Sequence, residues 1–151
     1  MIRLEVIELA EPSASALEDL KNYAAVASGC EQDSLLKSAL VTAFDKVQRM
    51  ANVALLPGRW KVCADDHSGI VPVYMGGKVV NITDEYGDAV RYNQRGGRAY
   101  LSTEGYVEVE FVTDVIPANY ARYMPVVCQY ATALYDGQDD KVLNSILRQC
   151  L

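Results

Sequence analysis

The period of the hydrophobic pattern changes twice along this chain, and this change constrains the fold more than any other feature. From Asp33 or Ser34 to the Pro57-Gly58 stop, apolar residues recur at helical spacing. They are Leu36, Leu40, Ala43, Phe44, Val47, Ala51 and Ala54. Between residues 58 and 113 apolar and polar residues alternate instead, as they do in strands. Helical spacing returns after Pro117. Helices on either side of a run of short antiparallel strands predict an α+β fold.

A shorter helix is expected before the long one, after Pro12-Ser13-Ala14-Ser15. Ser15 and Glu18 have the spacing of a capping box, in which each side chain satisfies a backbone N–H of the first turn. We expect Leu17, Leu20, Ala24 and Tyr23 to face inward, and Ser28-Gly29 to end the helix. Ahead of it, IRLEVIEL fits either a short strand or an extended arm over about 1–12 that is ordered against a neighbour.

The strand region contains several candidate segments, separated by turn residues. They are 59–63, 70–74, 78–82, 89–93, 98–101 and 106–112. Glu85-Tyr86-Gly87-Asp88 predicts a hairpin turn between 78–82 and 89–93. In the last segment Val107, Val109 and Phe111 share one face, while Tyr106, Glu108 and Glu110 share the other.

Two helices are expected at the C-terminal end. Pro117 suits a first helical turn, and Pro125 predicts either a kink or a restart of that helix. The segment from about 138 to 151 follows Asp136-Gly137 and carries a second apolar stripe: Val142, Leu143, Ile146, Leu147 and Cys150. This stripe suits either docking to a partner or packing on its own domain.

Size and charge narrow the class of protein. The 151 residues are enough for one domain with a real core. The net charge of −6 argues against a protein that grips nucleic acid, which needs clustered Lys and Arg. No apolar run is long enough for a membrane span, and the N-terminus lacks a signal-peptide pattern. We therefore expect synthesis and folding in a cytoplasm.

Residues with catalytic or metal-binding chemistry are sparse. The four cysteines lie at 30, 63, 128 and 150, without CxxC spacing, so structural zinc and other cofactors are not expected. His67 beside Asp65 and Asp66 allows a catalytic pair in principle, but an exposed turn is the better interpretation. A small enzyme that uses Cys63 or His67 is kept as a rival.

The acidic and glycine-rich positions have simple explanations. Asp84, Glu85 and Asp88 surround Gly87, but the bidentate Glu of a calcium loop is missing. Glu108 and Glu110 fit the wet face of a half-covered sheet better than an acid–base pair. Gly76-Gly77-Lys78 and Arg95-Gly96-Gly97-Arg98 lack phosphate-loop spacing and fit turns.

Tyrosine is unusually frequent, with ten copies against two Phe and one Trp. Four of them lie near the C-terminal end: Tyr120, Tyr123, Tyr130 and Tyr135. A large apolar ring with a polar tip suits a surface that is wet before assembly and buried after it. Ordinary core packing with exposed hydroxyls explains the same residues equally well.

Three stretches carry a resemblance to a known family. They are the helical pair at 16–56, the Pro-Val strand with its hairpin and Gly-Gly turn at 70–101, and the strand, Pro and Leu-Tyr-ending helix at 107–137. In order and spacing they resemble the head–tail connector (adaptor, or head-completion) proteins of long-tailed double-stranded DNA phages. The likeness covers most of the chain.

The resemblance implies a non-enzymatic virion protein in the neck, at the portal vertex. Family members form a ring, typically twelve-fold, that docks on the portal protein, extends the DNA channel and receives the next neck or tail protein. A wall that lets DNA slide should repel it, so Asp84, Glu85, Asp88, Glu108 and Glu110 are candidates for the channel or rim. No membrane is involved.

Candidate contact surfaces follow from the resemblance together with side-chain chemistry and ring geometry. The C-terminal segment inserts towards the portal in this family, which makes Val142, Leu143, Ile146 and Leu147 candidate portal contacts. The four C-terminal tyrosines are candidate interface residues, and the helix at 34–55 with the hairpins is expected between ring neighbours. The alternative within the same class is another neck or tail protein, a stopper or tail terminator. A generic interaction domain of prophage origin is a third alternative.

Overall fold

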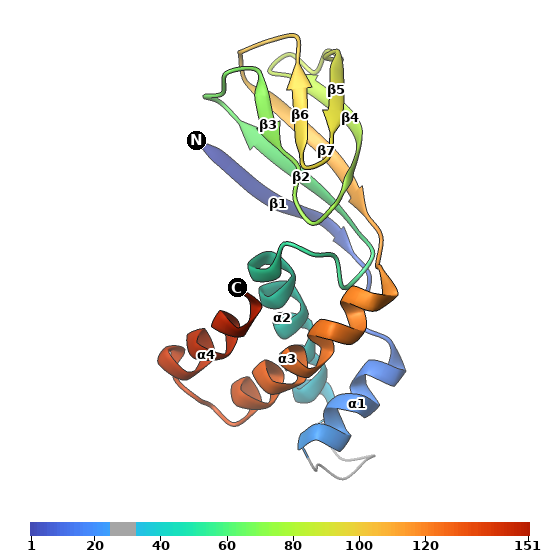
Figure 1. The fold of residues 1–151 in the computed structure, drawn as a ribbon, viewed down its shortest axis with the longest axis vertical. Coiled ribbons are helices and arrows are strands. Elements are labelled where there is room, and N and C mark those ends of the chain that lie inside the picture. The colour runs from blue at the N-terminus through green and yellow to red at the C-terminus, as the bar shows by residue number, and fades with distance from the viewer. Residues whose placement is uncertain (25–32) are drawn as a thin grey trace. The chain divides into compact units, whose positions relative to one another are not determined.

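The computed structural model describes residues 1–24 and 33–151, which group into two compact units (Figure 1). The β unit contains Met1–Ala10 and Leu56–Val115, and the helical unit contains the described residues of Glu11–Leu55 and Ile116–Leu151. Helices therefore precede and follow the main run of strands, and the predicted α+β class is confirmed. The predicted helix end at Ser28-Gly29, and Cys30, lie outside the described residues.

A four-stranded antiparallel sheet forms the larger part of the β unit. Its strands are β1 (Ile2–Leu9), β2 (Gly58–Ala64), β7 (Val107–Thr113) and β4 (Lys78–Asp84), in that order. The N-terminal IRLEVIEL is thus a strand of this sheet. Alternation places one set of side chains on a buried face, as predicted for β7. This set includes Trp60, Val62, Val79, Ile82, Val107, Val109 and Phe111.

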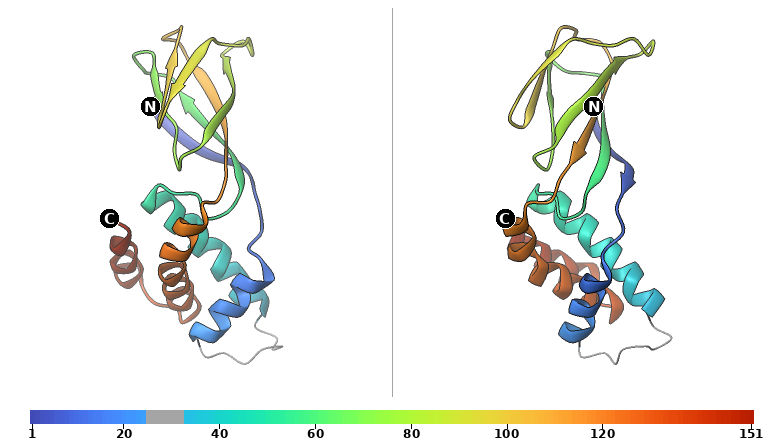
Figure 2. Two further views of the ribbon diagram at one scale, coloured as in Figure 1. Left: turned by 45° about the vertical axis from the view of Figure 1, so that its right-hand side comes forward. Right: turned by 90° about the vertical axis from the view of Figure 1, so that its right-hand side faces the viewer.

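A three-stranded sheet completes the unit, with β3 (Ile70–Pro72), β6 (Arg98–Leu101) and β5 (Tyr92–Arg95) in that order. Figure 2 shows it lying over one face of the larger sheet. Val71 and Ala99 are fully buried and add to the core. Arg95 pairs with Arg98 across a Gly96-Gly97 turn, where Gly96 has a φ of +56°. Glycine adopts this left-handed conformation without a steric penalty.

The predicted hairpin between 78–82 and 89–93 is only partly correct. The chain does turn at Glu85–Asp88, but the two arms meet in a single bridge, Thr83 with Ala89. Beyond that bridge the chain leaves the sheet, and β5 pairs with β6 rather than with β4. The Gly96-Gly97 turn brings β6 beside β5 with the shorter connection.

Four helices and a short 3₁₀ turn form the helical unit: α1 (Ala14–Ala24), α2 (Asp33–Ala51), α3 (Pro117–Tyr135), α4 (Asp140–Leu147) and η1 (Arg148–Cys150). Helix α3 contacts each of the other three. The predicted stripe of α2 is confirmed from Leu36 to Val47, since its members are fully buried. The helix ends at Ala51, before the Pro-Gly stop, because Asn52 takes a left-handed φ of +55°.

The structure tests three predictions for the helices: the capping box of α1, the start of α3 at Pro117 and the effect of Pro125. The capping box is wrong: Ser15 lies inside α1, and the hydroxyl of Ser13 accepts the Ala16 N–H at 3.1 Å. Pro117 begins α3 as predicted, but the helix does not restart at Pro125. Both Pro125 and Ala121, one turn earlier, are exposed, so water can satisfy the Ala121 carbonyl that Pro125 cannot bind.

Within the described ranges no helix is both long and apolar enough to cross a membrane.

Candidate functional site

The polar face of the four-stranded sheet gathers charged side chains from three strands. Register places Arg3 beside Cys63 and Cys63 beside Glu108, while Glu5 lies beside Lys61. Since opposite residues of an antiparallel pair point to the same side, these side chains form rows across the sheet. The buried face lies on the other side.

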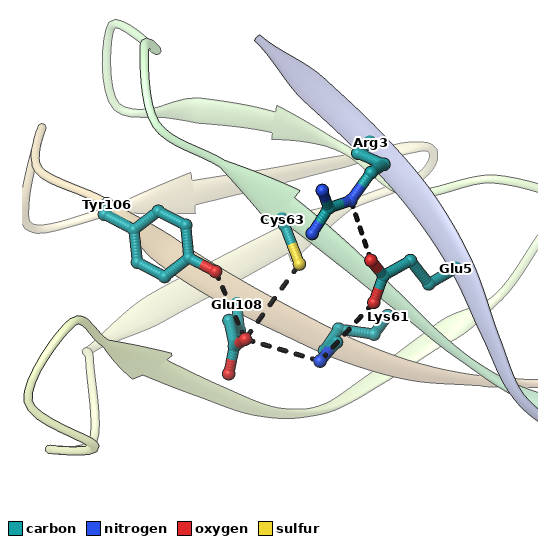
Figure 3. Close-up of polar contacts among 6 residues, drawn as sticks. All are labelled: Arg3, Glu5, Lys61, Cys63, Tyr106 and Glu108. Atoms are coloured by element: carbon teal, nitrogen blue, oxygen red, sulfur yellow. Dashed lines mark hydrogen bonds and ion pairs between the residues drawn. The ribbon is translucent and has the colours of Figure 1, made fainter.

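Ion pairs connect these side chains directly across from β1 to β2, diagonally from β2 to β7, and along β1 itself (Figure 3). The Lys61 ammonium lies 3.3 Å from a carboxylate oxygen of Glu108 and 3.5 Å from one of Glu5. Glu5 also accepts a contact from Arg3 at 2.7 Å. The hydrogen bond with Glu108 is the largest cause that raises the pKa of Lys61 above its ordinary value. The face therefore alternates in charge.

A second pair extends this pattern. Arg59 on β2 lies 3.2 Å from Glu110 on β7. Glu108 and Glu110 were both candidates for an acidic channel or rim. The structure gives each of them a basic partner, so they contribute little free negative charge to this face.

Glu108 also accepts two neutral donors. The Tyr106 hydroxyl donates to it at 3.2 Å, and the Cys63 thiol lies at 4.0 Å. The neighbouring Cys63 thiol, followed by desolvation and Glu108, raises the pKa of Tyr106 to about 12. Tyr106 therefore keeps its proton over the whole physiological range, and its hydroxyl donates a hydrogen bond to the carboxylate.

The other three acidic candidates lie at the end of β4 and in the turn that follows it. The Asp84 carboxylate accepts the N–H groups of Tyr86 and Asp88, both at 2.9 Å, and so fixes the turn. Glu85 and Asp88 are exposed. A hydrogen bond with Glu85 raises the pKa of Tyr86. Of the five acidic candidates, Glu85 and Asp88 present the most free negative charge.

Cys63 and His67 do not share a partner. Cys63 faces Glu108, whereas the His67 ring bonds to the Gly105 carbonyl at 2.6 Å and accepts the Gly69 N–H at 3.1 Å. His67 thus ties two loops together. Among residues 1–24 and 33–151, no three His, Cys, Asp or Glu side chains gather as metal ligands.

Three of the four candidate interface tyrosines belong to the core of the helical unit. Tyr123 and Tyr130 are buried, and half-buried Tyr120 stacks on Phe44 with ring centroids 6.1 Å apart. Burial raises the pKa of Tyr120 and of Tyr130. Tyr135 is half-buried and lines an open hollow of about 300 Å³ beside α2.

Of the four candidate portal contacts in the C-terminal segment, one is exposed and three are covered. Asp139 begins α4 by accepting the Val142 N–H at 3.1 Å. Leu143, Ile146 and Leu147 are buried within the helical unit, while Val142 is 40% exposed. Val142 is therefore the candidate portal contact that a partner reaches without moving α4.

Two buried polar side chains were not found from the sequence. Gln48 is fully buried, and its side-chain oxygen accepts the Leu55 N–H at 2.8 Å. It lies four residues after Phe44 and therefore on the apolar stripe of α2, so its burial could have been predicted from this position. Lys21 is 4% exposed and bonds to Asp33 at 3.0 Å. It has no sequence signal, because Lys is normally a surface residue.

The likeness of this chain to known proteins lies in its fold and not in its sequence. No family model matches the chain, and no curated protein matches it in sequence. Solved structures similar to this chain include a chain in the neck of an empty gene transfer agent (GTA) particle computed with C6 symmetry, one in the neck of the native GTA particle computed with C12 symmetry, and one in the virion of the native particle.

The likeness spans nearly the whole chain. For the empty-particle neck the TM-score is 0.57 at 15% identity, covering 94% of both chains. For the native neck it is 0.54 at 15%, covering 94% of this chain and 93% of the other. The virion chain gives 0.54 at 14%, with 87% and 86% covered. The fold is therefore shared with chains of GTA particles, which confirms the resemblance at the level of fold.

Proposed function

We propose that this chain is a structural subunit of a phage-like neck, a head–tail connector that works by assembly and not by catalysis. The single observation that carries the proposal is the match of its complete two-unit architecture to chains from GTA necks, over 94% of both partners in one case. A shared domain would match one unit only. Its place is the virion neck, after synthesis in the host cytoplasm.

In this proposal about twelve copies form a ring below the portal, extend the DNA channel and receive the next neck or tail protein. The similar chains come from neck structures computed with C6 and C12 symmetry, which supports a cyclic assembly. A cyclic ring needs two different patches on each copy that fit one another.

The outer side of α2 supplies one such patch. Leu35 and Val41 are exposed there, at 62% and 39%. Next to Leu35 is the hollow of about 300 Å³, lined also by Ser38, Thr42 and the end of α3. Small side chains beside a large exposed one allow close approach of a neighbouring copy. The β hairpins are the other expected ring contact.

The portal side is assigned to α4. Exposed Val142 lies beside an open hollow of about 550 Å³ that Lys141, Ser145 and Gln149 also line. A portal segment can occupy this hollow while Leu143 and its buried neighbours hold α4 in place. Contact through the buried Leu143, Ile146 and Leu147 would require α4 to separate from α3.

The channel side is assigned to the turn after β4. Glu85 and Asp88 carry exposed negative charge that repels the phosphates of a passing duplex. Glu108 and Glu110 are retained as rim candidates with a weaker effect, because Lys61 and Arg59 neutralise them.

The alternative position is elsewhere in the neck, as a stopper or tail terminator. Stoppers built mainly from β-barrels should lack the helical pair, whereas this chain has α1 and α2 in contact with α3. This supports the connector position. The enzyme alternative has weaker support, since Cys63 and His67 bind different partners.

Deletion of the gene in the producing phage or prophage tests the position. A connector is needed after packaging, so the mutant should accumulate separate heads and complete tails. Supplying the chain in trans should restore joined particles. Normal tailed particles without the chain would contradict the proposal. Heads joined to abnormal tails would favour the tail terminator alternative.

A further inference from the structure

The two edges of the four-stranded sheet differ in one respect. Both β1 and β4 are edge strands, and an edge presents unpaired backbone N–H and C=O groups to which another chain can bind. One of these edges is closed by the chain itself, and no described residue closes the other.

The β4 edge is closed by the segment that follows it. The Gln94 side chain accepts the Val79 N–H at 2.8 Å, and the Tyr92 hydroxyl donates to the Val79 carbonyl. Further along, the Asp84 N–H bonds to Asp88, and the Ile82 carbonyl accepts the Val90 N–H, each at 2.9 Å. A new strand cannot add here without breaking these bonds.

The β1 edge has no such cover within the described residues. The Asp65 N–H donates to the Met1 carbonyl, so odd-numbered residues of β1 bond to β2 up to the bulge after Val6. The backbone groups of Ile2, Leu4 and Val6 consequently point away from the sheet. The side chains of Ile2 and Val6 are 42% and 46% exposed.

We propose that the free chain forms a two-fold dimer in which β1 pairs with β1 of a second copy. Hydrogen bonding requires that Ile2, Leu4 and Val6 meet one another across the edge. A register centred on Leu4 does this: Leu4 faces Leu4 of the second copy, and Ile2 faces Val6 at both ends. The two four-stranded sheets become one continuous sheet.

Charge selects this register. Centred on Leu4, the pairing places Arg3 opposite Glu5 of the second copy, twice, on the polar face. A shift of two residues in one direction places Arg3 opposite Arg3, and a shift in the other places Glu5 opposite Glu5. Directly opposed like charges destabilise a strand pair, whereas opposite charges stabilise it.

A two-fold contact also explains how an open apolar edge avoids fibre formation. The same patch is used on both copies, so the contact closes after two chains. Neighbours in a ring are related by rotation about the ring axis and meet through two different patches, so they cannot make this two-fold contact. The dimer is therefore a state of the free chain, and it stands or fails independently of the neck proposal.

Sedimentation of the purified full chain over a range of concentrations tests this dimer. Val6→Pro removes an outward N–H without removing a bond to β2, so it should weaken dimerisation about ten-fold or more. Val6→Thr keeps the N–H and should dimerise within about three-fold of the wild-type chain. Circular dichroism confirms that both variants are folded.

A charge swap provides the second arm. Arg3→Glu should weaken the dimer, because Glu then faces Glu5, and adding Glu5→Arg in the same chain should restore it. Amide hydrogen exchange should show concentration-dependent protection at Leu4 and Val6 and none at Arg3 or Glu5, which already bond to β2. A chain that stays monomeric at every concentration, or that dimerises without this alternating protection, would overturn the inference.

Discussion

The ammonium of Lys61 on β2 lies 3.3 Å from a carboxylate oxygen of Glu108 on β7, and the same oxygen accepts the Tyr106 hydroxyl. One carboxylate thus binds two groups that hold their protons more tightly in the folded chain than in the unfolded one. The pKa of Lys61 is raised, and that of Tyr106 is raised from 10.0 to about 12. A raised pKa stabilises the fold below the unfolded value and is lost as the pH rises through the folded value.

Tyr106 therefore makes the free energy of unfolding fall between about pH 10 and pH 12, a window set by its two pKa values. Tyr106→Phe should flatten the fall, because Phe has no proton to lose. Cys63→Ala should flatten it as well, because the hydrogen bond with Cys63 is the largest cause of the raised Tyr106 pKa. Urea unfolding across this range measures the slopes. Identical slopes in all three proteins would show that the cluster does not titrate as described.

Gly77 lies where a side chain does not fit. A Cβ there would overlap the buried Phe111 ring, so Gly77→Ala should destabilise the β unit by about 1–3 kcal/mol. Gly105 has open surroundings, and Gly105→Ala should be close to neutral. In a Phe111→Leu background the effect of Gly77→Ala should shrink, because the clashing ring atoms are gone. Thermal unfolding of the wild-type chain, the two single variants and the double variant gives the coupling between Gly77 and Phe111. Full additivity would argue against the contact.

Gln48 holds the chain that leaves α2 by accepting the Leu55 N–H. Gln48→Met has a similar volume but no acceptor, so the buried N–H loses its partner, and the free energy of unfolding should drop by about 1–3 kcal/mol. Lys46→Met lies two residues earlier on the exposed side of α2 and serves as a matched control. Equal stability of the two variants in urea would mean that the Gln48 bond contributes nothing.

The C-terminal segment allows contact and stability to be separated. Val142→Arg changes the exposed member of the stripe, so it should reduce binding to the portal while leaving the melting temperature nearly unchanged. Leu143→Ala opens a cavity in the helical unit and should cost about 2–5 kcal/mol of stability. Co-sedimentation with purified portal and thermal melts distinguish the two effects. Normal portal binding by a folded Val142→Arg chain would show that this face of α4 does not contact the portal.

The acidic turn should affect passage of DNA. Glu85→Lys with Asp88→Lys reverses two exposed charges without touching Asp84, which fixes the turn. Attraction to phosphates should then slow ejection, most strongly at low salt, where screening is weakest. Asp114→Lys with Asp136→Lys reverses two exposed charges away from this turn and is the control. Unchanged ejection kinetics would place the turn away from the channel.

Local pattern predicted local structure well. The stripe of α2 and the alternation of β7 each predict the buried face of one element. Both predictions are confirmed, because each pattern depends only on the sequence of its own element. Helix α1 was less clear: Ala16 and Leu20 are buried, whereas the expected Tyr23 is 53% exposed. The order of elements gave the fold class, and the fold comparisons agree with the resemblance seen in that order.

Pairing over long distances was not predictable in this way. Turn residues at 85–88 indicated that the chain reverses, but not that β5 would pair with β6 beyond the reversal. Lys61 and Glu108 are 47 residues apart, and only the register of β2 with β7 brings them together. The open edge of β1 likewise depends on sheet order, which no single segment contains.

If this chain is a neck subunit, it is present in every assembled particle. Imaging of intact particles from the producing strain, at a resolution that traces side chains, therefore tests the assignment. We expect a closed ring of this chain next to the portal, with α4 towards the portal and the turn at Glu85 towards the channel. A complete neck traced without this polypeptide would show that the chain is not a neck subunit.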